Sequence, residues 1–142
     1  MQPFYLQQPL RFSCTRCGKC CATAGEYYVY LNEAESERIR EYLQLSRGWF
    51  RRRYMRRLED GERVLVSAAD ARCIFLNADG SCRVYPVRPL QCRTYPFWPE
   101  LVNTATTWQR ESRRCEGINR GQVVSRGKVE RSVQSCLRYE QE

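Results

Sequence analysis

The stretch "FSCTRCGKCC", residues 12–21, places four cysteines within eight positions of a chain of 142 residues. Cys14 and Cys17 have the C-x-x-C spacing at which two thiolates reach one metal ion, and the glycine that follows permits the tight turn. A thioredoxin-like redox motif would need a βαβ context, which the sequence lacks. Cys20 and Cys21 are adjacent, so a simple two-cysteine metal-binding turn does not explain the cluster.

The third cysteine, Cys20, makes the cluster typical of iron–sulfur proteins as well as of zinc sites. C-x-x-C-x-x-C is the spacing with which a short loop holds three corners of a [4Fe–4S] cluster while a distant cysteine supplies the fourth. The same three thiolates with one remote ligand could also hold zinc, although zinc ribbons usually supply two C-x-x-C pairs. The spacing therefore favours iron–sulfur slightly over zinc. Because the side chains of adjacent residues diverge in a strand or a helix, Cys21 indicates either a second centre or a bridging ligand.

The downstream part of the chain supplies further candidate ligands, which do not follow the apolar face of any expected helix. These are Cys73, Cys82, Cys92 and Cys115. Four plus four thiolates suffice for two four-coordinate, all-cysteine centres. The chain has no histidine, which excludes mixed Cys/His sites. The ninth cysteine, Cys136, fits the apolar stripe of the last helix and is expected to be a buried hydrophobic side chain.

Composition and charge limit the other classes of function. The formal net charge of +8 is typical of nucleic-acid binding, but eight metal-bound thiolates and two divalent ions would lower it to +4. The sequence shows no signal peptide and no apolar stretch approaching about 18 residues, so we expect no membrane segment and a cytoplasmic location. In a reducing cytosol, clustered cysteines bind metal or do redox chemistry more often than they form disulfides.

The remaining sequence predicts a small α+β fold, an irregular cysteine-rich domain organised by metal, with two or three helices and a β-hairpin. Asn32 and Glu35 form a capping-box pattern that predicts a helix up to about residue 45. Apolar spacing predicts helices over 47–58 and 125–140, and the second of these buries Val129, Val133 and Leu137 beside the ninth cysteine. The other expected elements are extended segments at 1–13, 27–31 and 62–66, a hairpin at 73–85, an irregular proline-rich segment at 85–101, and backbone loosened by glycines at 117 and 121. We expect one domain over 1–142, with a metal-chelating core at 12–121 and a C-terminal helix at 122–142.

The order of these motifs points to a family. CxxCxxCC, followed by "CIFLNADGSCRVYPVRPLQCRTYPFWPEL" (73–101) and "CEGI" (115–118), resembles the YkgJ-like cysteine-cluster family of zinc- or iron-chelating proteins. The resemblance covers roughly residues 12–121 and brings no settled reaction or substrate. Family members often have a proline after the last cysteine, where this chain has Glu116. The resemblance implies metal chelation through eight residues: Cys14, Cys17, Cys20, Cys21, Cys73, Cys82, Cys92 and Cys115.

Closed all-cysteine sites leave no open coordination position, which favours a structural or electron-transfer role, with an unidentified protein as a candidate partner. No catalytic constellation is recognisable, so the sequence does not decide whether the protein is an enzyme. Two alternatives stay open: a nucleic-acid-binding zinc protein that uses the expected Arg51–Arg57 helix, and a redox enzyme or accessory protein with an undercoordinated site. Nucleic acid is the less favoured partner, because an arginine run is more often a solvated helix face.

Overall fold

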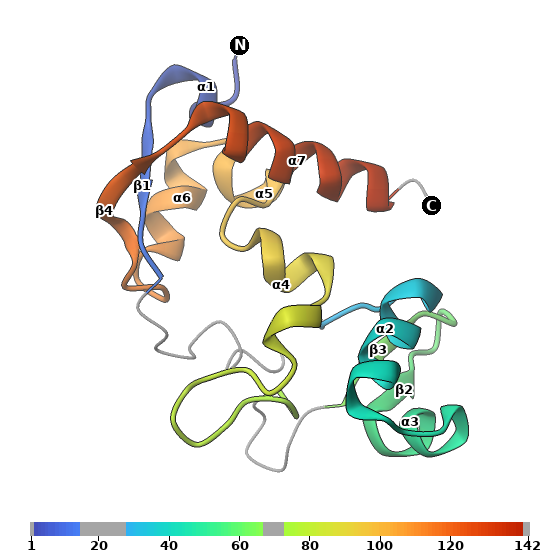
Figure 1. Cartoon of the computed structure of the whole chain (residues 1–142). Helices are drawn as coiled ribbons and strands as arrows, with labels where there is room; N and C mark the ends of the chain where they lie inside the picture. The colour runs from blue at the N-terminus through green and yellow to red at the C-terminus, as the bar shows by residue number, and fades with distance from the viewer. Residues whose placement is uncertain (1, 15–27, 67–72, 141–142) are drawn as a thin grey trace. The chain divides into compact units, whose positions relative to one another are not determined.

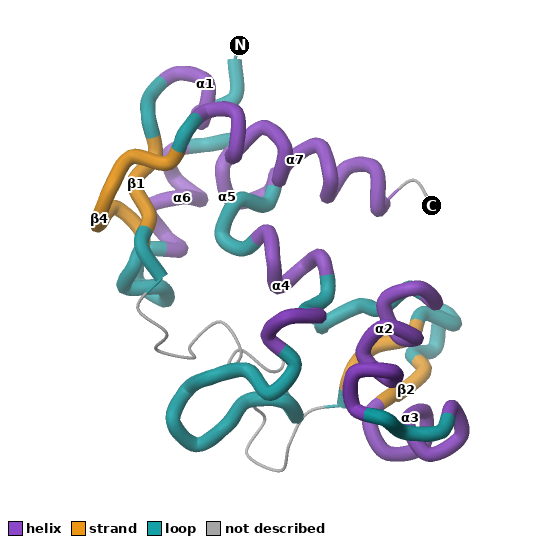
Figure 2. Tube along the Cα trace, viewed as in Figure 1, coloured by secondary structure: helices purple, strands orange, loops and turns teal. Residues whose placement is uncertain are grey.

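The computed structural model describes residues 2–14, 28–66 and 73–140 (Figure 1). The chain divides into two compact units, unit 1 with residues 1–17 and 94–142 and unit 2 with residues 18–93, so that the boundary falls within α4 (Leu90–Thr94). The α+β class is confirmed: the described residues form seven α-helices, a 3-10 helix and two small antiparallel sheets (Figure 2). Several helices are shorter than the window over which apolar periodicity can be recognised in a sequence.

Unit 1 is built around an antiparallel pair of strands that lie far apart in the sequence. β1 (Leu10–Phe12) pairs with β4 (Ile118–Val124), a strand that the sequence did not indicate. The other elements are α1 (Phe4–Gln7), α5 (Pro99–Val102), α6 (Ala105–Glu111) and α7 (Arg126–Glu140). The fully buried Trp108 stacks on Phe97 in the core, and its Nε1 donates to Asn119 Oδ1 at 3.0 Å. The indole ring is therefore packed in the core and its N–H has a hydrogen-bond acceptor, which a buried Trp requires.

The C-terminal helix α7 confirms the predicted helix, but fewer of its residues are buried than the sequence predicted. Val129 and Val133 are buried in the unit 1 core, as expected. Leu137 is 36% exposed and Cys136 is half-buried, so the prediction that Cys136 is a buried hydrophobic side chain is wrong. Its thiol donates to Thr94 Oγ1 at 3.4 Å, because this part of α7 lies beyond the apolar core and meets a polar side chain there.

Unit 2 begins its regular structure with α2 (Glu33–Leu43), and the predicted capping box is present. The Glu35 N–H donates to Asn32 Oδ1 at 2.8 Å, and the Asn32 N–H donates to Glu35 Oε1 at 3.1 Å. The second carboxylate oxygen of Glu35 accepts from the Leu90 N–H at 2.6 Å. The carboxylate is buried but accepts these hydrogen bonds, so the cap also ties α2 to the first turn of α4.

The helix predicted over 47–58 is wrong in its last four residues, 55–58. α3 (Arg47–Tyr54) ends at Tyr54, and β2 (Met55–Arg57) continues as a strand paired with β3 (Arg63–Leu65). The four-residue spacing of apolar side chains was compatible with a longer helix. Residues 55–57 form a strand instead because β3 follows directly after a tight turn at residues 58–62 and supplies the hydrogen bonds of β2.

The expected strand at 62–66 is confirmed by β3, and the β-prone run before α2 adds to the same sheet. Tyr30 forms an isolated bridge to Val64, and the Leu65 N–H donates to the Val29 carbonyl at 3.0 Å. The proline-rich segment contains the 3-10 helix η2 (Tyr85–Val87) and α4. No helix among the described segments combines the length and the apolar character needed to cross a lipid bilayer.

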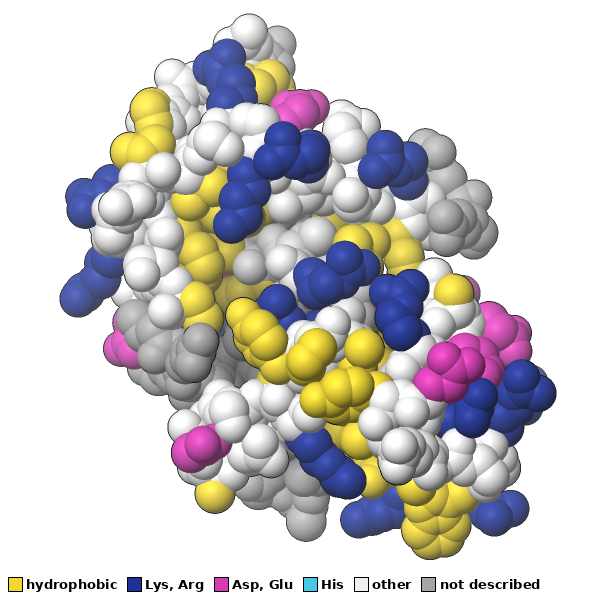
Figure 3. Space-filling model, viewed as in Figure 1, with side chains coloured by type: hydrophobic (Ala, Val, Ile, Leu, Met, Phe, Trp, Pro, Cys, Tyr) yellow, Lys and Arg dark blue, Asp and Glu magenta, His cyan; other side chains and the backbone are white. Residues whose placement is uncertain are grey.

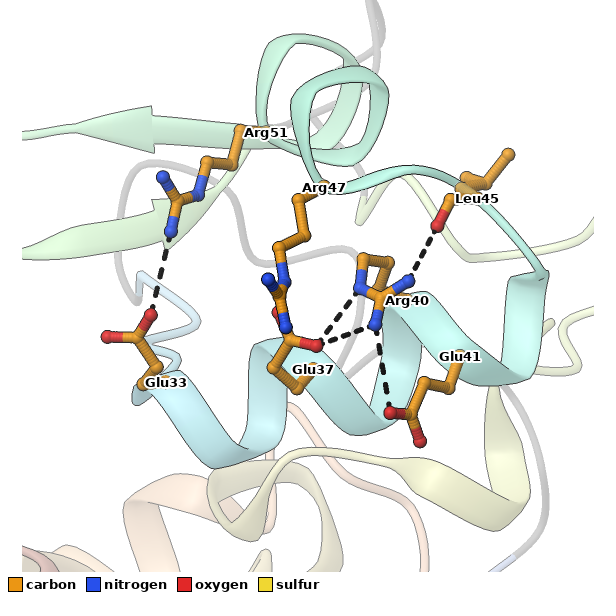
Figure 4. A network of polar contacts seen from close by, with 7 residues as sticks. All are labelled: Glu33, Glu37, Arg40, Glu41, Leu45, Arg47 and Arg51. Carbon is orange, nitrogen blue, oxygen red and sulfur yellow. Dashed lines mark hydrogen bonds and ion pairs between the residues drawn. The ribbon is translucent and has the colours of Figure 1, made fainter.

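A network of ion pairs joins α2 to α3 (Figure 4). Glu37 accepts from Arg40 Nη2 at 2.7 Å and from Arg47 Nε at 2.8 Å. Hydrogen bonds from Arg40 and then from Arg47 lower the pKa of Glu37 to about 2. Because the folded pKa lies below the unfolded one, Glu37 stabilises the fold above the unfolded pKa, and this contribution is lost as pH falls through the folded value.

We therefore expect Glu37→Gln to lower the thermal unfolding temperature at neutral pH, and the difference from wild type to shrink as pH falls from about 4.5 toward 2. Unfolding curves recorded across this range would measure the effect. The matched control is Glu41→Gln, since Glu41 is 70% exposed and its contact with Arg40 is 3.7 Å long. A gap between wild type and Glu37→Gln that stays constant down to the lowest pH would contradict the prediction.

Candidate metal centre

The described residues contain part of the predicted ligand set. Cys14, Cys73, Cys82, Cys92 and Cys115 are described, and the first is exposed while the others are half-buried. The remaining predicted ligands, Cys17, Cys20 and Cys21, lie outside the described residues. Within the described ranges, no three Cys, Asp or Glu side chains gather closely enough to hold a metal ion.

The first and last predicted ligands lie in neighbouring segments of unit 1. Cys14 is the second residue after β1, and Cys115 lies between α6 and β4. The Ser13 N–H donates to the Gly117 carbonyl at 3.1 Å, which holds the residue before Cys14 against the turn that contains Cys115. The Cys115 N–H donates to the Glu111 carbonyl at 3.0 Å and its carbonyl accepts from Ile118, so this turn is fixed by its own hydrogen bonds.

Glycines make this close approach feasible, a role that the sequence did not reveal. A Cβ on Gly117 would lie 2.1 Å from the Ser13 carbonyl oxygen and 3.2 Å from Phe12 Cε1. Gly121 has a φ of +77°, and a Cβ there would lie 2.5 Å from the Ser13 Cβ. The expectation that these glycines loosen the backbone is wrong, because they sit against β1 within or beside a paired strand. The glycines themselves were the available signal, since glycine in a strand often marks a close backbone approach.

The segment from Cys73 to Cys82 forms the predicted turn without the predicted strands. The Asn77 N–H donates to the Ser81 carbonyl at 2.8 Å, and an isolated bridge joins Leu76 to Cys82. Both cysteines pack against the edge of the unit 2 core, so their backbone is anchored while the thiols stay half-buried.

Asp79 stabilises this turn through hydrogen bonds to its side chain. Its Oδ1 accepts from the Ser81 hydroxyl at 2.6 Å and from the Ser81 N–H at 3.0 Å. These hydrogen bonds lower the pKa of the Asp79 carboxyl. The carboxylate is thus engaged in an Asx-type turn, which is the role its place beside Gly80 indicates.

The donor set fits zinc or iron. Its members are thiols, the ligands that zinc and iron–sulfur centres prefer, and the described ones stand on backbone held by turns, short helices and strand ends rather than inside the apolar cores. Cys92 follows this pattern as well, since its N–H donates to the Pro89 carbonyl in the first turn of α4.

The arginines beside the cysteines make contacts of their own. Arg83, next to Cys82, lies 3.4 Å from the Tyr54 hydroxyl through Nη1, and Arg93, next to Cys92, donates to the Arg88 carbonyl at 3.1 Å. Both guanidinium groups are therefore held by hydrogen bonds within unit 2.

Comparison with known proteins identifies the family. Residues 13–116 match the family model described as "CxxCxxCC: Putative zinc- or iron-chelating domain". A protein of Methanocaldococcus jannaschii described as uncharacterized is 28% identical over 125 residues, covering 85% of this chain, and the match spans 63% of that relative's length. No solved structure matches the chain. Because the family model covers most of the chain, the protein belongs to the CxxCxxCC family of zinc- or iron-chelating domains.

Proposed function

We propose that this metal-binding protein holds zinc or iron–sulfur in two closed centres formed by its eight predicted cysteine ligands. A [4Fe–4S] cluster is slightly favoured over zinc, since three of the ligands follow the C-x-x-C-x-x-C spacing and the others are single and remote. The role proposed is structural or electron-transferring, because four thiolates leave no coordination position open to a substrate. Such thiolates stay available for metal in the reducing cytoplasm, which is the location we propose.

The observation that carries the proposal is the contact between the segments of Cys14 and Cys115. These residues stand at the two ends of the family match, a hundred residues apart in the chain. The Ser13–Gly117 hydrogen bond and the absence of a Cβ on Gly117 nevertheless hold their backbones together. This proximity is the arrangement needed for a C-x-x-C-x-x-C loop and its distant fourth ligand. We therefore assign Cys14 and Cys115 to the same centre.

The first experiment is the metal content and visible spectrum of protein purified without oxygen. An iron–sulfur protein would be brown, with equimolar iron and sulfide, and would show a reversible one-electron couple. A zinc protein would be colourless and contain zinc without sulfide. Protein that contains neither metal, and takes up neither when it is supplied, would contradict the proposed function.

Single and double substitutions test the pairing of the two ligands. We expect Cys14→Ser and Cys115→Ser each to lose the metal of one centre, and the double variant to lose no more than either single variant, because both remove the same site. Metal analysis per folded chain is the measurement. Cys136→Ser is the matched control and should keep the full metal content. A double variant that loses the metal of both centres would show that the two cysteines serve different sites.

A further inference from the structure

The arginines of unit 2 divide into two groups by their partners. Arg40, Arg47 and Arg51 form ion pairs with glutamates of α2 at distances between 2.7 and 3.5 Å (Figure 4). A second group has no carboxylate at ion-pair distance among the described residues. Its members between α3 and β3 are Arg52 and Arg53 on α3, Arg56 and Arg57 on β2, and Arg63 on β3. The charge of this second group is therefore open to an external anion.

The strand register places two of these arginines directly opposite each other. Arg57 on β2 pairs with Arg63 on β3. Like charges in directly opposed positions destabilise an antiparallel pair, and a two-stranded sheet has little stability to spare. An anion held between two guanidinium groups would remove the repulsion and gain charge-assisted hydrogen bonds. The register thus points to an anionic ligand at this hairpin.

Aromatic side chains accompany the arginines. The Arg56 guanidinium carbon lies 5.7 Å from the centroid of the Tyr28 ring, and Tyr28 is 45% exposed. Trp49 is 50% exposed on α3, three and four residues before Arg52 and Arg53, and so shares their helix face. Figure 3 shows basic side chains flanking hydrophobic ones over this part of unit 2, at the bottom of the view.

Tyr28, Arg56 and Arg57 border a shallow cleft of about 640 Å³. Its lining joins the arginines and Tyr28 to the turn of the hairpin, with Arg56, Arg57, Leu58, Glu59 and Asp60. The cleft therefore offers positive charge, an aromatic face and carboxylate acceptors side by side. Phosphates, unstacked bases and base amino groups are the chemical groups that match these three features.

We propose that this arginine surface, made of Arg52, Arg53, Arg56, Arg57 and Arg63 with Tyr28 and Trp49, binds single-stranded nucleic acid. The exposed rings favour a single strand over a duplex, whose bases are already stacked. An acidic protein would bind to the positive charges of the arginines, but it would leave the exposed aromatic rings without a role. None of these residues is a predicted ligand, so the proposal does not depend on which metal the protein holds. It also replaces the expected Arg51–Arg57 helix by a helix end joined to a hairpin.

The test is fluorescence anisotropy with a short labelled oligouridine strand and the metal-loaded full chain. Binding should weaken as salt rises from about 50 to 200 mM. Arg56→Gln/Arg57→Gln should flatten the slope of log K against log salt by about 1.4, since each single-strand phosphate contact contributes about 0.7. Tyr28→Leu should weaken binding about 5- to 150-fold, the effect of losing one stacked base.

The matched control is Arg120→Gln/Arg131→Gln, which removes the same charge from exposed positions of unit 1 and should leave the slope and affinity unchanged. Circular dichroism and metal content confirm that each variant is folded. Absence of binding at low salt would overturn the proposal. Equal binding of polyglutamate or of anionic vesicles, with no effect of Tyr28→Leu, would overturn it in favour of a purely electrostatic surface.

Discussion

Removal of the metal by a chelator is expected to unfold most of the chain. The described apolar residues form two separate small clusters, one in each unit, and neither is the size of the core of a typical stable domain. Metal binding to thiolates contributes on the order of 10 kcal/mol in structural zinc sites, which is as large as the whole stability of many domains. Circular dichroism and thermal unfolding before and after chelation would measure the loss.

Two controls make this result specific to the metal. Chelator that is first saturated with zinc should leave the protein folded, and return of zinc, or of iron with sulfide, should restore the native spectrum. A metal-free sample that keeps its native circular dichroism and its unfolding temperature would show that the two apolar cores suffice. The metal would then be bound by a fold that exists without it.

The substitution Gly117→Ala is expected to disrupt unit 1 and its predicted ligands together. The new Cβ would lie 2.1 Å from the Ser13 carbonyl oxygen, a backbone atom that cannot move aside as a flexible side chain can. Either β1 must shift or the turn after Cys115 must open, and both break the Ser13–Gly117 hydrogen bond. Overpacking of this kind costs about 1–3 kcal/mol, and we expect the upper end because backbone meets backbone.

Gly117→Ala should also lower the metal content, since the shift separates the segments of Cys14 and Cys115. Gly48→Ala is the matched control, because a Cβ there meets nothing closer than Arg52 Nη1 at 3.6 Å. Gly48 is the second residue of α3, and alanine is a better helix former than glycine, by up to about 1 kcal/mol in a helix interior, so this variant should be as stable as wild type or more so. A Gly117→Ala protein that unfolds like Gly48→Ala and keeps its metal would refute the close approach.

Local interactions explain which elements the sequence predicted well. The start of α2 depends on Asn32 and Glu35, three residues apart, and the turn before Cys82 depends on Asp79, Gly80 and Ser81. Each of these features satisfies its hydrogen bonds within a few residues, so no distant partner can override it. The same holds for the position of α7, whose buried valines recur at helical spacing.

The limits of prediction lie where distant segments meet. The end of α3 at Tyr54 could not be read from the apolar spacing, because the strand β3 competes for the backbone groups of residues 55–57. Strand β4 was missed because its residues are mostly exposed and interrupted by a glycine, and its partner β1 lies at the other end of the chain. The arginines of α3 and β2 looked alike in sequence, and the glutamates of α2 divide them into paired and open groups.

By itself, the sequence determined the family of this protein and predicted its thiolate donors, because both follow from cysteine identity and spacing along the chain. The tertiary structure alone decided that the segments of Cys14 and Cys115 are neighbours. It also placed Arg56, which has no carboxylate at ion-pair distance among the described residues, over the exposed ring of Tyr28. The physical reason is that a short spacing fixes which atoms a loop can present. Contacts between residues far apart in the chain depend instead on strand register, on the absence of a Cβ at Gly117 and on the packing of each core.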